Sequence, residues 1–162
     1  IVYYPDPTAP GGTGHTEQAT YSEAPEVWER NMLRLKKKLE GARKLNPVPM
    51  IETTPGAETG LIAFGSTDPA VQEARHLLAQ QGVKTDYMRI RAYPFNTEVY
   101  DFVRSHARNY VIELNRDGQL HQLLSLDLPE RATSLISLAH LDGLALTARW
   151  VVNAFQAKEQ QR

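Results

Sequence analysis

Residues 60–71 read GLIAFGSTDPAV, and this stretch sets the fold class of the chain. The apolar run 61–64 favours a buried strand, and the Gly-Ser-Thr sequence at 65–67 then interrupts it with turn-forming residues. Asp68 is expected to cap a following helix, since Pro69 is tolerated in the first helical turn. A strand, a tight turn and a helix in succession are the building block of an α/β domain.

The same alternation continues along the chain. Three more apolar segments predict strands, within 83–91, 109–114 and 132–138, and a short strand fits 50–53. The residues expected to begin further helices are Asn96, Gly118 and Thr147. We therefore expect an α/β fold in three layers, with helices on both faces of a mostly parallel sheet.

A different pattern precedes the sheet. Residues 22–26 have the acids and the proline that favour a helix start. An apolar stripe then recurs at spacings of four, three, four and three, formed by Trp28, Met32, Leu35, Leu39 and Ala42. The cations of the same helix lie mostly off that stripe, which favours a solvated basic face and leaves open a contact with phosphate or an acidic partner.

Prolines at 47 and 49 predict the end of this helix and a linker. The expected organisation is a lead-in loop, helix and linker over 1–49 and an α/β domain over 50–162. The chain starts with Ile1, and its opening 1–14 is rich in Pro, Gly and Thr, so we expect a loop there and a domain fragment or a cleaved product.

The net charge and the amino-acid composition exclude several classes of protein. The net charge of −1 argues against a nucleic-acid-binding protein, and no apolar run approaches the length of a membrane span. Cysteine is absent, so the chain has no disulfide and no thiolate for an iron–sulfur cluster. These features fit a cytoplasmic protein.

Candidate ligand or interface residues lie where the strands end. Ligands of open α/β sheets favour the carboxyl ends of the strands, and backbone amides at a helix start can hold an anion. Turns and helix caps explain the same residue types without a ligand. The candidates are Gly65, Ser66, Thr67, Asn115, Arg116 and Asp117, together with His15 in the glycine-rich segment GTGH at 12–15.

No motif for catalysis or metal binding is evident. The sequence lacks GxGxxG, GxxxxGK[ST], HExxH and GxSxG, and its five histidines are scattered. We therefore assign no catalytic residue and no metal ligand, and expect no complete active site in this chain.

Six motifs occur in a fixed order and together resemble one family. They are GTGH at 12–15, EAPEVW at 23–28, GSTDPAV at 65–71, RIRAYPF at 89–95, NRDGQL at 115–120 and DGLALTA at 142–148. In this order and spacing the chain resembles the C-terminal domain of the α subunit of 2-oxoacid:ferredoxin oxidoreductases, the core domain II of the pyruvate enzymes. The resemblance extends from residue 12 to about 155. Residues 4–7 do not reproduce the Tyr-Pro-Ile-Thr-Pro stretch of the family's pyrimidine-binding domain.

The resemblance implies a transketolase C-terminal-like fold with a five-stranded mixed sheet and one antiparallel strand. It implies an enzyme that decarboxylates a 2-oxoacid, with 2-oxoglutarate preferred over pyruvate or branched-chain acids, to acyl-CoA with electrons passed to ferredoxin. The intact enzyme would use thiamine diphosphate, Mg²⁺, [4Fe-4S] clusters and coenzyme A, none of them bound by this chain alone.

The implied partners are the other domains of the α subunit and the β subunit, ferredoxin through the intact complex, and an oligomeric assembly. In that setting the isolated chain is expected to be inactive and to have a structural role. Two alternatives remain open from the residues, a free-standing α/β module that binds a small anion and an oligomerisation domain.

Overall fold

A computed structural model describes residues 14–16 and 18–161, and the chain divides between Leu45 and Asn46 into two units. The first unit contains α1 (Pro25–Leu45), preceded by a β-bridge between His15 and Tyr21. Helix α1 begins inside the stretch 22–26, as predicted. Within this unit the four large residues of its apolar stripe, Trp28, Met32, Leu35 and Leu39, are exposed, and Asn31 is the buried residue of the helix.

The second unit is built on a five-stranded sheet with the order β1-β3-β2-β4-β5. Its strands are β1 (Met50–Glu52), β2 (Thr59–Phe64), β3 (Thr85–Ile90), β4 (Arg108–Glu113) and β5 (Leu135–Ala139). Strands β2 to β5 are all parallel to one another, and the edge strand β1 pairs antiparallel with β3. The mostly parallel sheet and its one antiparallel strand confirm the predicted fold class.

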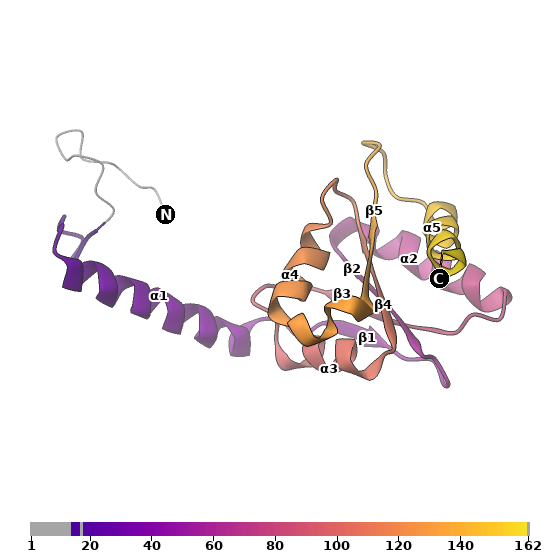
Figure 1. The fold of residues 1–162 in the computed structure, drawn as a ribbon, viewed down its shortest axis with the longest axis horizontal. Coiled ribbons are helices and arrows are strands. Elements are labelled where there is room, and N and C mark those ends of the chain that lie inside the picture. The colour runs from indigo at the N-terminus through magenta and orange to yellow at the C-terminus, as the bar shows by residue number, and fades with distance from the viewer. Residues whose placement is uncertain (1–13, 17, 162) are drawn as a thin grey trace. The chain divides into compact units, whose positions relative to one another are not determined.

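Two helices cover each face of this sheet (Figure 1). On one side lie α2 (Asp68–Gln80) and α5 (Ala148–Gln160), and on the other α3 (Thr97–Ser105) and α4 (Gln119–Asp127). Neighbouring residues of a strand point to opposite faces, so Leu61 packs with α2 and α5 whereas Ile62 packs with α3 and α4. The central strand β2 is mainly apolar and almost entirely buried, as expected for a strand covered on both faces.

Three local predictions were tested by the helix ends. The side chain of Thr147 accepts a hydrogen bond from the backbone of α5, so the predicted cap is confirmed. Asn96 occupies the N-cap position of α3 without a side-chain bond. The cap assigned to Asp68 is wrong, because a short 3-10 turn, η1 (Gly65–Thr67), comes first and Thr67 takes the N-cap position.

The strand predicted within 132–138 was placed too early. Residues Pro129–Ser134 form a second 3-10 turn, η2, and β5 begins only at Leu135. The hydroxyl of Ser134 donates to the carbonyl of Arg131, which supports the turn conformation. In the part of the chain that the structure describes, no helix has both the length and the apolar character needed to cross a membrane.

Candidate functional site at the carboxyl edge of the sheet

The two predicted loops lie at the same edge of the sheet. Strands β2 and β4 are parallel neighbours, with Ala63 opposite Ile112, so the segments 65–67 and 115–117 follow adjacent strand ends. His15 belongs to the first unit, where its ring Nδ1 lies 3.0 Å from the carbonyl oxygen of Thr16. The rest of its motif, residues 12 and 13, lies outside the described residues.

The loop after β4 is organised by Asn115. Its side-chain oxygen accepts hydrogen bonds from the backbone amides of Gly118 at 2.7 Å and Gln119 at 3.3 Å. These are the first amides of α4, which lack partners inside the helix. An anion at this helix start would have to displace Asn115.

Glu113 satisfies the next two amides and is a site residue that the sequence analysis missed. It is the last residue of β4, its side chain is fully buried, and it accepts hydrogen bonds from the amides of Leu120 at 2.8 Å and His121 at 3.1 Å. The side-chain amide of Asn115 donates to the same carboxylate at 2.6 Å. A carboxylate is stabilised at the positive end of a helix. The carboxylate of Glu113 therefore occupies the position at the start of α4 that a bound anion would take. The sequence does contain one signal for this role, because Glu113 is an acidic residue that directly follows an apolar run and shortly precedes a helix.

Arg116 is also occupied within the loop. Its guanidinium forms two hydrogen bonds to the carboxylate of Asp117, at 2.6 and 3.0 Å, and this pairing raises the pKa of Arg116. The side chain is 72% exposed, so solvent screens the pair. Among the described residues, the candidates of this loop satisfy one another and do not converge on an empty position.

The loop after β2 has a similar arrangement. The hydroxyl of Thr67 donates to the carbonyl of Phe64 at 2.6 Å, and Ser66 is exposed. The carboxylate of Asp68, in the first turn of α2, accepts the hydroxyl of Tyr87 at 2.7 Å and lies 3.4 Å from Arg89. A carboxylate at this place disfavours a second anion.

A mainly apolar groove lies beside the loop after β2, at the same edge of the sheet. It has a volume of about 460 Å³ and runs from the end of β2 past the end of β3 to the first turns of α4. Arg91 is the charged side chain among its lining residues, which are Phe64, Gly65, Ile90, Arg91, Ala92, Tyr93, Phe95, Gln119, Leu120 and Leu123. Such a lining suits an apolar group better than a phosphate.

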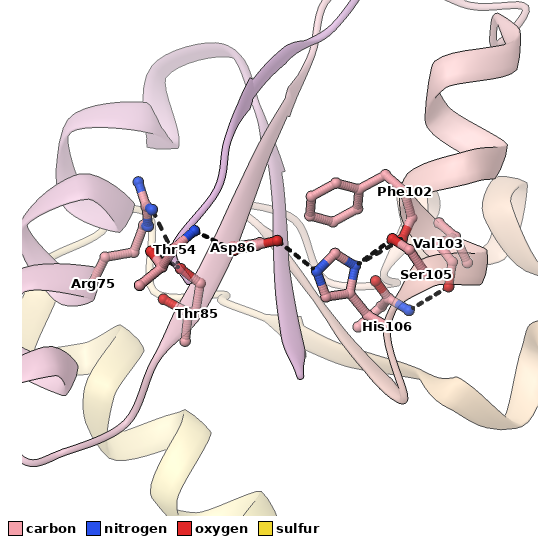
Figure 2. Close-up of polar contacts among 9 residues, drawn as sticks. Thr54, Arg75, Thr85, Asp86, Phe102, Val103, Ser105 and His106 are labelled. Atoms are coloured by element: carbon pink, nitrogen blue, oxygen red, sulfur yellow. Dashed lines mark hydrogen bonds and ion pairs between the residues drawn. The ribbon is translucent and has the colours of Figure 1, made fainter. Parts of the chain in front are cut away.

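A buried polar network lies toward the opposite ends of the strands (Figure 2). Asp86 accepts a hydrogen bond from the backbone amide of Thr54 at 2.6 Å, and its other oxygen lies 3.0 Å from Nε2 of His106. The imidazole Nδ1 lies 2.8 Å from the carbonyl oxygen of Phe102. The network therefore joins the segment after β1, strand β3 and the end of α3.

Ser105, His106 and Asp86 have the residue types of a hydrolytic triad, but their arrangement does not support catalysis. The hydroxyl of Ser105 lies 3.2 Å from the imidazole and 2.9 Å from the carbonyl of Phe102, which also contacts the ring. The imidazole is only 4% exposed, so a substrate could not reach it. Within residues 14–16 and 18–161, no three His, Cys, Asp or Glu side chains gather in a way that could hold a metal ion.

Comparison with known proteins identifies the fold. No protein-family model and no curated protein matches the sequence. Among solved structures, a 2-oxoglutarate:ferredoxin oxidoreductase from Magnetococcus marinus matches with a TM-score of 0.70 and 25% identity, over 96% of this chain. A split-gene transketolase, an inactive β4 tetramer, matches with a TM-score of 0.55 and 21% identity over 67% of this chain and 40% of its own.

The chain has a transketolase C-terminal-like fold. The predicted resemblance is thereby confirmed, because its structural neighbours include both a transketolase and a 2-oxoacid:ferredoxin oxidoreductase. The alpha chain of a probable 2-oxoacid ferredoxin oxidoreductase from Thermoplasma acidophilum aligns with a TM-score of 0.42 and 19% identity, over 70% of this chain and 96% of its own. The domain spans 28% of the length of the Magnetococcus marinus chain that it matches.

Proposed function

We propose that this transketolase C-terminal-like domain belongs to the α subunit of a thiamine-diphosphate-dependent 2-oxoacid:ferredoxin oxidoreductase. That enzyme would oxidatively decarboxylate a 2-oxoacid, 2-oxoglutarate first among the candidates, to its acyl-CoA and pass electrons to ferredoxin. Residues 1–49 would be a lead-in segment and 50–162 the α/β domain. We place the assembly in the cytoplasm.

One observation supports the proposal above all. The match to the 2-oxoglutarate:ferredoxin oxidoreductase extends over 96% of this chain, and so includes the segment before the sheet as well as the α/β unit. That structure has 2-oxoglutarate, coenzyme A and succinyl-CoA bound. Its substrate is the reason for preferring 2-oxoglutarate to pyruvate or a branched-chain 2-oxoacid.

The two helix starts at the carboxyl edge do not fit the diphosphate group of such an enzyme's cofactor. The amides that start α4 already donate to Glu113 and Asn115, and Asp68 lies in the first turn of α2, so neither helix start is free for a diphosphate. The sequence has no cysteine to bind an iron–sulfur cluster.

The role of the domain would be structural. A carboxyl edge whose polar groups are satisfied internally can pack against another domain without leaving buried donors unpaired. The partners would be the remaining domains of the α subunit and the β subunit, with ferredoxin reached through the complex. The hydrogen bonds of the α4 loop argue against the free-standing anion-binding module, because Arg116 and the amides that start α4 already have partners.

The test uses the native assembly. An antibody to this chain should capture a polypeptide well above 18.2 kDa from source extract, with activity that reduces a viologen dye only when a 2-oxoacid and coenzyme A are both present. Comparing 2-oxoglutarate with pyruvate and a branched-chain acid would give the substrate. A free band at 18.2 kDa without such activity would contradict the proposal.

The isolated chain provides a second test. Titrating it with thiamine diphosphate and Mg²⁺ in a calorimeter should give no binding heat. Tight binding would show that this domain contains a cofactor site that the proposal denies.

A further inference from the structure

The described residues of the first unit leave the large side chains in the apolar stripe of α1 exposed. Trp28, Met32, Leu35 and Leu39 are each 39–51% exposed, although they recur on one side of the helix. Within its own unit, α1 is contacted on a neighbouring side, where Asn31 donates to the carbonyl of His15. Four large apolar side chains in a row on a helix commonly mark an interaction surface.

The spacing of the stripe specifies what kind of surface fits it. Positions 28, 32, 35, 39 and 42 alternate by four and three residues, which is the a/d pattern of a heptad repeat. With Met32 and Leu39 at a, the d positions are Trp28, Leu35 and Ala42. A narrow a/d seam accepts the knobs of another helix, and just over two heptads are too short to form an independent coiled coil. The fitting occupant is therefore a helix of a folded partner.

The charges beside the seam specify the partner further. In a coiled coil the e and g positions flank the seam and choose the partner through ion pairs. Here these positions are Glu29, Asn31, Lys36, Lys38, Arg43 and Leu45, three cations against one acid. A parallel pair of α1 helices would set Lys38 against Arg43, so the pattern disfavours a second copy and favours acidic flanks on the partner.

We propose that α1 docks by this seam against an amphipathic helix with acidic e and g positions on a partner polypeptide. The proposal does not depend on the enzymatic function, since it rests only on the spacing, exposure and charge of α1. A basic amphipathic helix can also bind an anionic membrane. The protein partner is favoured because the apolar residues form a narrow heptad seam, while the exposed Leu33 at position b lies away from it.

The experiment uses the full 162-residue chain and the fluorescence of Trp28. The sequence has two tryptophans, so Trp150→Phe leaves Trp28 as the reporter on the seam. The probes are two synthetic peptides of about four heptads with Leu at a and d, one with Glu and one with Gln at e and g. We expect the Glu peptide to shift the Trp28 emission to the blue and to bind roughly tenfold more tightly than the Gln peptide at low salt, a difference that salt removes.

Matched variants separate the seam from the rest of the helix. Leu35→Gln on the seam should weaken binding of the Glu peptide, whereas Leu33→Gln at position b should leave it unchanged. Lys36→Glu combined with Lys38→Glu should remove the preference for the Glu peptide. Because these side chains are exposed, circular dichroism should show the same fold for each variant.

Four outcomes would overturn the proposal. They are equal affinity for both peptides, no emission shift with either peptide, a shift with phosphatidylserine vesicles but not with peptides, and a shift that depends on the protein concentration alone. The third would assign α1 to a membrane surface and the fourth to a second copy of this chain. None of them bears on the oxidoreductase assay, so failure here and failure of the proposed function can be told apart.

Discussion

Replacing Glu113 by Gln tests the central claim about the carboxyl edge, that a buried carboxylate holds the start of α4. One oxygen of Glu113 accepts from Leu120 and from the side chain of Asn115, and the other accepts from the amide of His121. A glutamine keeps only one oxygen. In its better orientation the new amide group faces the N–H of His121, so two donors meet and one hydrogen bond is lost.

The expected cost follows from the lost interactions. A hydrogen bond to a charged group contributes about 1.5–3 kcal/mol, and a carboxylate at a partly buried helix N-terminus adds about 0.3–2 kcal/mol. Burying a charge is itself unfavourable, and the neutral amide recovers part of that cost. We expect a net loss of about 2–4 kcal/mol in the free energy of unfolding, which lowers the melting temperature by roughly 10 °C for a domain of this size.

Urea denaturation and thermal unfolding of the full chain would measure the change. Glu130→Gln is the matched control, since that carboxylate is half exposed and pairs with Arg104 on the surface. It should leave the urea midpoint almost unchanged, because solvent screens an exposed ion pair. If Glu113→Gln were neutral or stabilising, the cost of burying the carboxylate would exceed the value of its bonds, and the account of this loop would be wrong.

Three further changes test other parts of the domain. Gly118 has φ +64°, and a Cβ there would lie 2.8 Å from the hydroxyl of Ser137. Gly118→Ala should therefore lower the urea midpoint by the equivalent of about 1–3 kcal/mol. An unchanged midpoint would contradict this interpretation. Thr147→Ala should cost about 1 kcal/mol by removing the N-cap bond of α5, seen as a lower melting temperature that Thr147→Ser largely restores. Burial and the hydrogen bond to Asp68 raise the pKa of Tyr87, so the unfolded chain loses this phenol proton first and stability should fall as pH rises above about 10. Tyr87→Phe should flatten that alkaline part of a pH series of denaturation midpoints, and an identical slope would refute the assignment.

Much of the fold was predictable because its signals are local. Apolar runs bounded by turn residues located β2, β3 and β4 to within a few residues, since strands buried on both faces are mainly apolar. The predictions failed where a 3-10 turn replaced a simple boundary. At Thr67 and again at Ser134 the turn moves the start of the next element, and the side chains that favour turns, caps and strand ends are largely the same.

The site was less predictable, because it depends on pairings between distant residues. The sequence marked the right loops, but it could not show that Asn115 and Asp117 would bind within their own loop. The buried contact between Asp86 and His106 joins residues 20 positions apart. No local sequence pattern around either residue predicts that they pair. The role of Glu113 was not predicted, because this residue directly follows the apolar run 110–112 and its hydrogen-bond partners lie seven and eight residues further along the chain.

The three-residue strand β1 has a consequence for the handling of this domain. Together with β2, it encloses β3, whose sequence TDYMRI is almost entirely buried. A short edge strand gives other molecules little backbone to pair with, whereas a longer bare apolar edge is a template for aggregation. A truncation that begins after Glu52 would uncover the backbone of β3, and we expect it to precipitate where a chain that retains β1 stays dispersed.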